Sequence, residues 1–234
     1  MLIDSYYSEN DTGISFSRQQ ASNFAKNIAD DFNPLHDPEA KLFCVPGDLL
    51  FALVLARYGV SQRMRFTFSG MVDNNQLLHF SESDDGKLNL LNGEEKSFLS
   101  VERSGANNQN SEFSESLTRN YVEFSGHTFP DVLIPLMSKH EVMINPARPI
   151  IIYQSMEIDL ERVDIPTADL EFTGAHLNVE GKRGNVRLDF QLNLLGKTVG
   201  SGTKYMAMRG LRPLDQQTID EIVSTYMERK QLGS

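Results

Sequence analysis

An acid and a base stand five residues apart in the segment Asp31–His36, which reads DFNPLH. A carboxylate and an imidazole that meet on a rigid turn can hold a water molecule between them and move its proton. Asp31 and His36 are therefore predicted to form an acid/base pair. The structural alternative is that Asp31 caps the turn and that His36 makes only structural hydrogen bonds. Asn33 is expected to make turn hydrogen bonds in either case.

A helix is predicted directly before this pair. Ser17 and Gln20 fit a capping box, in which each side chain satisfies a free backbone N–H at the helix start. Apolar residues then recur at i, i+3, i+4 and i+7 from Ala21 to Ile28 and give the helix one apolar face. The Asn-Pro bend ends the helix, because proline pushes the residue before it out of the α region.

A second helix is predicted to begin at Pro46-Gly47, since proline is favoured in a first turn, where its missing N–H is no loss. The run Leu49–Ala56 is apolar on every side, which is typical of a helix that is buried all round. Gly59 stands where a C-cap is expected. We expect a sheet to curl around this helix.

Strand-like segments follow the second helix. They span residues 63–71, 76–81, 87–91 and 96–103. A polar stretch at 105–112 has no apolar periodicity and is predicted to be a linker. The element order then repeats, with a short helix at 116–124, a proline-started apolar helix at 130–140, and strands at 149–163, 170–179, 185–195 and 197–208.

This repeat predicts an α+β protein with a double hotdog fold, in which two antiparallel sheets each wrap around a central apolar helix. The expected units are an N-terminal half at 1–104, the linker at 105–112, a C-terminal half at 113–211 and a C-terminal helix at 212–234. The C-terminal helix is expected to begin at Asp215 or Thr218. Its apolar face should pack on the body of the protein or on a second subunit.

Composition restricts the class of protein. The chain has 234 residues, of which 40% are hydrophobic, so it can bury a large core. A net charge of −10 and the absence of a basic run argue against nucleic acid as a partner. Cys44 is the single cysteine, which excludes an intrachain disulfide and favours a reducing compartment. The longest apolar run, Leu49–Ala56, is far shorter than the roughly 20 residues that span a bilayer. We therefore expect a cytoplasmic protein without membrane insertion.

The acid/base segment carries a family resemblance. Together with Phe24-Ala25 in the helix before it and the PGDLL sequence that begins at Pro46, it resembles the motif of the MaoC-like (R)-specific enoyl-CoA hydratases. That motif reads Asp-x-Asn-Pro-hydrophobic-His, followed by Asp-Pro and a small residue. The resemblance covers about residues 15–60 well and the remainder only by element order. It implies a bacterial branch of the hotdog superfamily.

The resemblance implies hydration of a trans-2-enoyl thioester, or the reverse dehydration. His36 would accept a proton from water, and Asp31 would hold that water and transfer a proton at the α-carbon. Backbone N–H groups near Gly47 would polarise the thioester carbonyl, because a helix N-terminus favours a developing oxyanion. Asn33 joins Gly47 in the implied substrate-binding set. The implied partner is an acyl thioester of coenzyme A or acyl carrier protein, with no cofactor and no metal, and a homodimer is compatible with it.

Other functions remain open at this stage. A hotdog protein that binds acyl thioesters or lipids, or that has a regulatory role, would keep the fold and lack the hydration reaction. A thioesterase would normally carry its carboxylate on the central helix, where Asp48 is the one acid near the helix start. The C-terminal half is expected to be non-catalytic, because Val122 stands five residues before His127. Cys44 is interpreted as a small buried residue rather than as a nucleophile.

Overall fold

Groups of strands and groups of helices follow one another along the chain in a computed structural model that describes residues 2–84 and 86–233. The strands are β1 (Ser8–Asn10), β2 (Gly13–Ser15), β3 (Val60–Phe68), β4 (Leu78–Glu82), β5 (Leu88–Asn92), β6 (Ser97–Asn108), β7 (Val142–Met143), β8 (Ile150–Leu160), β9 (Asp169–Glu180), β10 (Arg183–Leu194), β11 (Lys197–Arg209) and β12 (Arg212–Pro213). The helices are α1 (Arg18–Asn27), the 3₁₀ helix η1 (Pro34–His36), α2 (Gly47–Tyr58), α3 (Ser111–Gly126), α4 (Thr128–Asp131), α5 (Leu133–Lys139) and α6 (Gln216–Gly233).

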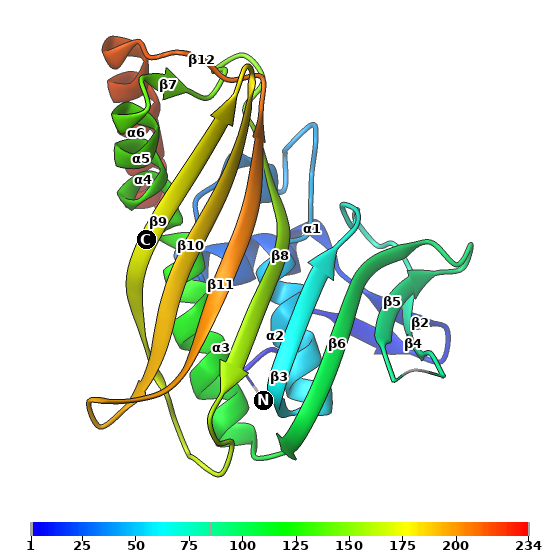
Figure 1. The fold of residues 1–234 in the computed structure, drawn as a ribbon. Coiled ribbons are helices and arrows are strands. Elements are labelled where there is room, and N and C mark those ends of the chain that lie inside the picture. Colours follow the sequence, from blue (N-terminus) through cyan, green and yellow to red (C-terminus); the bar gives the residue numbers. More distant parts are fainter. Residues whose placement is uncertain (1, 85, 234) are drawn as a thin grey trace.

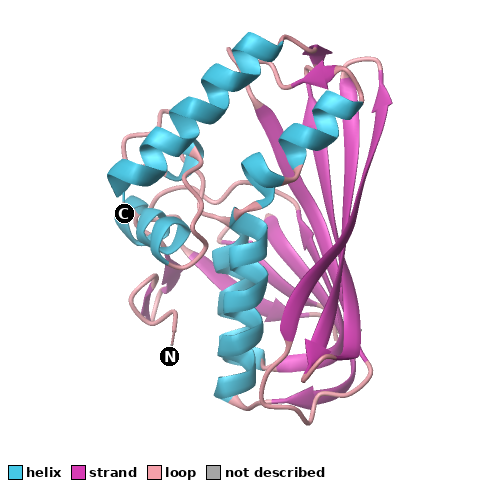
Figure 2. Cartoon of the chain, turned by 90° about the vertical axis from the view of Figure 1, so that its left-hand side faces the viewer, coloured by secondary structure: helices cyan, strands magenta, loops and turns pink. Residues whose placement is uncertain are grey.

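One large antiparallel sheet forms the framework, as an α+β fold requires. Its order is β1-β2-β4-β5-β6-β3-β8-β11-β10-β9, and β7 pairs separately with β12 (Figure 1). The helices lie on one side of this sheet (Figure 2). The bounds of the predicted strands are confirmed to within a few residues. The prediction succeeds because apolar residues alternate along these strands, with the apolar side facing the helices.

The strands of the two halves meet at a single seam. β3 pairs with β8 in register from Arg63 opposite Asp159 to Thr67 opposite Ser155. The two sheets expected from the sequence are therefore parts of one continuous sheet. The seam matters for the site, since it brings β8 and β11 of the second half beside the start of α2.

Helix α2 confirms the predicted apolar helix. Every residue from Asp48 to Leu55 is buried, and Gly59 ends the helix with a φ of +70°. Ring contacts fix its position, because Phe51 packs edge-on against Phe66 of β3 and tilted against Tyr121 of α3. An all-round apolar helix is stable only where other elements cover every side of it, and here the sheet and α3 do so.

The expected linker at 105–112 is wrong. Strand β6 continues to Asn108, and α3 begins at Ser111. Asn110 is the N-cap of α3, since its side chain accepts a hydrogen bond from the backbone N–H of Glu112 at 2.8 Å. The stretch looks like a linker because this end of β6 is solvent-exposed, and an exposed strand end needs no apolar alternation.

The expected helix order of the second half also needs correction. The long helix beside α2 is α3, whose Phe113, Leu117 and Tyr121 are fully buried. The segment 130–140, expected to be the apolar helix of this half, instead forms the short helices α4 and α5. Pro135 lies early in α5 and has no N–H for the preceding turn, so a continuous helix cannot run through this segment.

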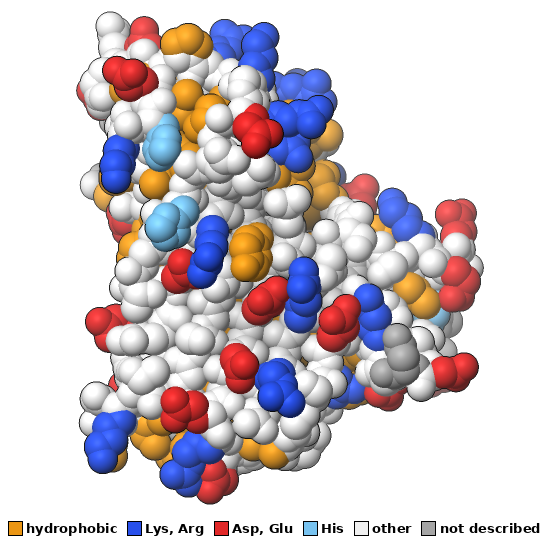
Figure 3. Space-filling view, viewed as in Figure 1, with side chains coloured by type: hydrophobic (Ala, Val, Ile, Leu, Met, Phe, Trp, Pro, Cys, Tyr) orange, Lys and Arg blue, Asp and Glu red, His pale blue; other side chains and the backbone are white. Residues whose placement is uncertain are grey.

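The outer face of the sheet is polar and carries both signs of charge. Figure 3 shows side chains of both charges on this face. Cross-strand ion pairs join Arg65 to Glu157 at 3.1 Å and Lys87 to Glu102 at 3.3 Å. The site therefore lies on the other face, among the helices. None of the described helices has the length and apolar character needed to cross a bilayer.

Candidate active site

Asp31 and His36 meet after the end of α1. The helix ends as predicted, with the Ser17–Gln20 capping box present at its start. Asn33 then caps η1, because its Oδ1 accepts the N–H of Leu35 at 3.1 Å, which is the turn role predicted for it. The turn brings Nε2 of His36 to 3.6 Å from Oδ2 of Asp31. This distance is too long for a direct hydrogen bond.

The histidine is held in one tautomer. Nδ1 of His36 lies 2.7 Å from the carbonyl oxygen of Cys44. A carbonyl only accepts, so Nδ1 carries the proton and Nε2 of the neutral ring presents a lone pair toward Asp31. In return, the N–H of Cys44 donates to the carbonyl of Leu35 at 3.1 Å. The short segment before α2 thus fixes the imidazole as a proton acceptor.

The Asp31 carboxyl sits in a partly desolvated position. Its Oδ1 accepts the N–H of Asn33 at 2.9 Å, which leaves Oδ2 facing His36. Burial raises the pKa of Asp31 above its usual value near 3.8, although the His36 ring when protonated, the bond from Asn33 and the charge of Lys204 act in the opposite direction. A carboxyl with a raised pKa can carry a proton as well as release one.

Helix α3 presses directly on the segment that holds Asp31. A Cβ atom built on Gly126 would lie 1.8 Å from the carbonyl oxygen of Ala29 and 3.3 Å from Cβ of Asp31. Only glycine allows so close an approach between the two backbones. The acid/base segment is therefore set against the end of α3 as well as by its own turn.

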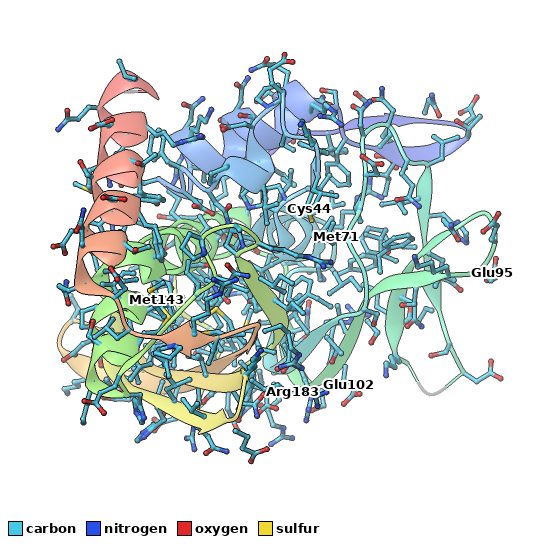
Figure 4. All side chains as sticks on the ribbon, turned by 90° about the horizontal axis from the view of Figure 1, so that it is seen from above. Cys44, Met71, Glu95, Glu102, Met143 and Arg183 are labelled. Carbon is cyan, nitrogen blue, oxygen red and sulfur yellow. The ribbon has the colours of Figure 1, made fainter. Side chains whose placement is uncertain are left out.

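Both residues line a cavity of about 700 Å³. Gly47, the first residue of α2, lines it too, together with Asn33. Aromatic rings crowd this helix start, since a Cβ on Gly47 would lie 3.1 Å from the Tyr153 ring and 3.2 Å from the Phe68 ring. Much of the remaining wall is apolar, and Cys44 and Met71, two of its residues, are labelled in Figure 4. The four residues predicted for the site thus border one cavity.

Three further polar residues form what we call the cavity floor: Asp48, Ser125 and Lys204. Ser125 donates to Oδ2 of Asp48 at 2.5 Å, and the Lys204 ammonium donates to Oγ of Ser125. Burial lowers the pKa of Lys204, against the opposing charges of Asp48 and Asp31. Side chains from α2, α3 and β11 thus place two buried groups of opposite charge, bridged by the Ser125 hydroxyl, beside Asp31 and His36.

Lys204 is not among the residues predicted for the site, although the sequence carries a signal for it. Successive strand residues point to opposite faces, so Lys204 shares its face of β11 with Met206 and Met208, both buried. A single lysine in the apolar phase of a strand is rarely buried without a partner. The Lys204 ammonium bonds to Ser125 of α3, which in turn bonds to Asp48 of α2, and no sequence pattern connects the three residues.

Helix α6 covers the acid/base segment. Asp215 caps it as predicted, accepting the N–H of Thr218 at 2.8 Å. The Tyr226 hydroxyl accepts the backbone N–H of Phe32 at 3.3 Å. Two ion pairs complete the contact: Lys230 with Asp30, and Arg229 with Asp37 at 2.6 Å. The apolar face of this helix therefore packs on the body of the chain and closes one side of the cavity.

His127 also contacts the segment that carries Asp31. Its Nε2 lies 2.6 Å from Oδ2 of Asp30, a contact between α3 and the segment just before Asp31. No carboxylate stands in its own half at the spacing that an acid/base pair would need, because Val122 occupies that position and is buried. That the second half supplies no acid/base pair of its own stays a prediction.

Cys44 is expected to react slowly with alkylating reagents. Its thiol donates to the carbonyl of Val45 at 3.2 Å, and burial raises the pKa of the thiol from 9.0 to about 11. Only the thiolate is nucleophilic, so labelling by iodoacetamide at pH 8 should be about a hundredfold slower than in the urea-unfolded chain. The rate should rise about tenfold per pH unit up to pH 11. Cys44 is only partly buried, so fast labelling of the folded protein at pH 7 would contradict the raised pKa of its thiol.

Comparisons with solved structures give remote likenesses. A MaoC-like dehydratase is 10% identical, with 88% of this chain and 98% of that chain covered and a TM-score of 0.44. The acyl-CoA thioesterase II TesB2 from Mycobacterium marinum is 9% identical, with coverages of 90% and 98% and a TM-score of 0.44. A conserved protein of unknown function with a hot dog fold from Alicyclobacillus acidocaldarius is 9% identical, with coverages of 92% and 99% and a TM-score of 0.47.

Because their TM-scores are below 0.5, these structural similarities do not indicate a function. Function is inferred below from the side chains of the site. No curated protein matches the sequence significantly. A family model described as "Protein of unknown function (DUF3581)" matches residues 1–217, more than nine-tenths of the chain. The chain therefore belongs to the DUF3581 family.

Proposed function

We propose that the protein is a hydratase or dehydratase of trans-2-enoyl thioesters carried by coenzyme A or acyl carrier protein. We assign it a double hotdog fold with halves at 1–104 and 113–211 and with α6 outside them. One observation carries the functional proposal. Nε2 of His36 is held as a proton acceptor 3.6 Å from Oδ2 of Asp31, inside a cavity of about 700 Å³.

The spacing of the two acceptors suits one water molecule. A gap of 3.6 Å is too long for a direct bond, and one water can donate an O–H to each group. In hydration, Nε2 of His36 takes a proton from this water, and the hydroxide oxygen bonds to C3 of the enoyl thioester. The C2–C3 π electrons move toward the thioester oxygen and form an enolate. The proton taken by His36 then passes to Asp31 and from Asp31 to C2, which leaves Asp31 ionised and His36 neutral as at the start.

The start of α2 is proposed to stabilise the enolate oxygen. Gly47 and Asp48 are the first two helical residues, whose N–H groups have no carbonyl partner within a helix. Such groups, with the positive end of the helix dipole, favour a developing negative charge. Asn33 lines the same cavity and is proposed to position the substrate through the turn it holds.

Ligand binding tests this proposal first. Crotonyl- or octanoyl-coenzyme A at a hundredfold excess over its dissociation constant should stabilise the fold by ~2.7 kcal/mol, measured as a rise in melting temperature. Loss of the enoyl absorbance of crotonyl-coenzyme A then reports hydration. A shift without turnover would favour a protein that binds acyl thioesters without reacting them. Neither a shift nor turnover would reject the proposed function.

A hydrolytic function has one observation in its favour. Asp48 lies on α2 and lines the cavity, where a thioesterase would carry its carboxylate. Its Oδ2 is already bonded to Ser125, and Lys204 bonds the same hydroxyl. Release of free coenzyme A from crotonyl-coenzyme A, followed with a thiol reagent, distinguishes hydrolysis from hydration. We rank hydration first because of the fixed tautomer of His36.

A further inference from the structure

We infer that the cavity floor of Asp48, Ser125 and Lys204 binds a hydroxyl group on the acyl chain of the substrate. The inference rests on the proposed function and narrows the substrate class from acyl thioesters in general to hydroxylated ones. Three features of the cavity floor support the inference: hydrogen-bonding atoms that are not fully satisfied, two opposite charges, and a position next to Gly47.

The first observation is a buried hydrogen-bond acceptor that has no donor. Asp48 is only 8% exposed, and its Oδ2 accepts from Ser125. Among the described residues, its Oδ1 is the one buried side-chain oxygen without a hydrogen-bond partner. A buried carboxylate oxygen left without a donor is costly, and Asp48 lines the cavity. Less than 1 Å² of Oδ1 is exposed, so a ligand donor reaches it and removes that cost once the carboxylate turns toward the cavity.

The second observation is a buried donor beside it. Lys204 is 4% exposed, and its ammonium lies 4.3 Å from the centre of the Tyr153 ring. One of its three N–H groups donates to Ser125. The ring faces the ammonium but offers no lone pair, so a ligand oxygen in the cavity is the natural acceptor for another N–H. The Tyr153 hydroxyl bonds to that of Tyr121, which holds the ring in place.

The charges of the floor select the chemical class of ligand. A ligand carboxylate would be repelled by Asp48, and a ligand ammonium would be repelled by Lys204. An unsubstituted hydrocarbon chain would satisfy neither group. A hydroxyl is uncharged, donates one hydrogen bond and accepts others. It therefore fits both Oδ1 of Asp48 and the Lys204 ammonium.

Position limits where this hydroxyl lies on the acyl chain. Asp48 directly follows Gly47, whose N–H is proposed to hold the thioester oxygen, so the floor lies close to the reacting carbons. The apolar wall, which includes Leu133, Ile144 and Met206, is left for the hydrocarbon part of the ligand. We therefore place the hydroxyl a few carbons from the thioester, at C4 to C6.

Calorimetric titration with saturated acyl-coenzyme A pairs tests the inference. The pairs are 4-hydroxybutyryl and butyryl, 5-hydroxypentanoyl and pentanoyl, and 6-hydroxyhexanoyl and hexanoyl. Saturated chains have no C2=C3 double bond to hydrate, so affinity is measured independently of turnover. At one or more positions the hydroxylated chain should bind at least about tenfold more tightly, as charge-assisted hydrogen bonds predict. Equal affinities within all three pairs would overturn the inference.

A double variant assigns the preference to the floor. Asp48→Asn with Lys204→Met removes both charges together and so leaves no unpaired buried charge. Its ratio of affinities within each pair should fall to about one, and a ratio keeps its meaning if overall binding weakens. Lys197→Met, at the exposed start of the same strand, is the matched control and should keep the preference. A preference that survives in the double variant would refute the assignment.

The outcomes separate this inference from the proposed function. Binding of unsubstituted chains without any hydroxyl preference would remove the inference and leave the hydratase proposal standing. Failure of every acyl-coenzyme A to bind would overturn both. Hydration of crotonyl-coenzyme A together with a hydroxyl preference would support both.

Discussion

Replacing Asp31 by asparagine is expected to lower kcat for enoyl-thioester hydration by about 10²–10⁴-fold and to raise the melting temperature at neutral pH. Asparagine keeps the size of the side chain and can still accept the N–H of Asn33. It cannot carry the proton for C2 or take one from His36. Activity against crotonyl-coenzyme A and thermal melts on the same samples measure the two effects.

The gain in stability follows from the sign of the pKa shift. Burial raises the pKa of Asp31 above its unfolded value near 3.8, so the folded state binds its proton more tightly than the unfolded state does. Ionised Asp31 therefore opposes folding, and this cost appears as the pH rises from about 3.8 through the folded pKa. The difference in melting temperature between variant and wild type should vanish below pH 3.8. A variant that is less stable at pH 7 would contradict the desolvated position of Asp31.

His36→Ala should lower kcat over the same range, about 10²–10⁴-fold. The double variant with Asp31→Asn should lose little more, because two groups that hold one water act as a unit. His176→Ala is the matched control, since His176 lies on β9 with 74% of its side chain exposed. Loss of activity in the control, or multiplicative losses in the double variant, would speak against a shared water.

Gly126→Ala is the second large effect that we expect. The added Cβ would lie 1.8 Å from the carbonyl oxygen of Ala29, so the backbone before Asp31 must move by about 1 Å or more. Overpacking of this kind costs about 1–3 kcal/mol. A shift of about 1 Å in a catalytic group can cost about 10²-fold in rate. Urea unfolding and the hydration assay measure the two losses.

A second glycine provides the control for this variant. A Cβ on Gly174, in β9, would meet no atom within 4 Å. Gly174→Ala should therefore leave both the free energy of unfolding and kcat close to those of wild type. If Gly126→Ala behaves like this control, the close approach of α3 does not position Asp31.

The sequence was sufficient to predict the local elements and the closeness of Asp31 and His36. The Ser17–Gln20 box, the apolar run of α2 and the Asn-Pro turn are each determined by neighbouring residues, and the structure has all three. The two predicted residues line one cavity because the motif that carries them is a single short turn. Such local elements depend on the secondary-structure propensity of neighbouring residues and on the spacing of apolar residues, and both can be read from the sequence.

The features that were missed depend on long-range packing. Helix α3 appeared short and polar because half of its surface faces solvent, so the more apolar 130–140 was preferred as the second long helix. The cavity floor joins Asp48 to Ser125 across 77 positions and Lys204 to Ser125 across 79. Such partners become neighbours only through the β3–β8 seam and the α2–α3 contact. No periodicity in one segment encodes them.

Because α6 covers the Asp31–His36 turn, the turn can be covered only late in translation. The contacts of Phe32 with Tyr226 and of Asp30 with Lys230 join residues 194 and 200 positions apart. At about 5–20 residues per second, the ribosome adds the covering residues roughly 10–40 s after the segment itself. While these residues are being added, the nascent chain therefore carries the Asp31–His36 turn uncovered. The cavity acquires this wall only when α6 docks.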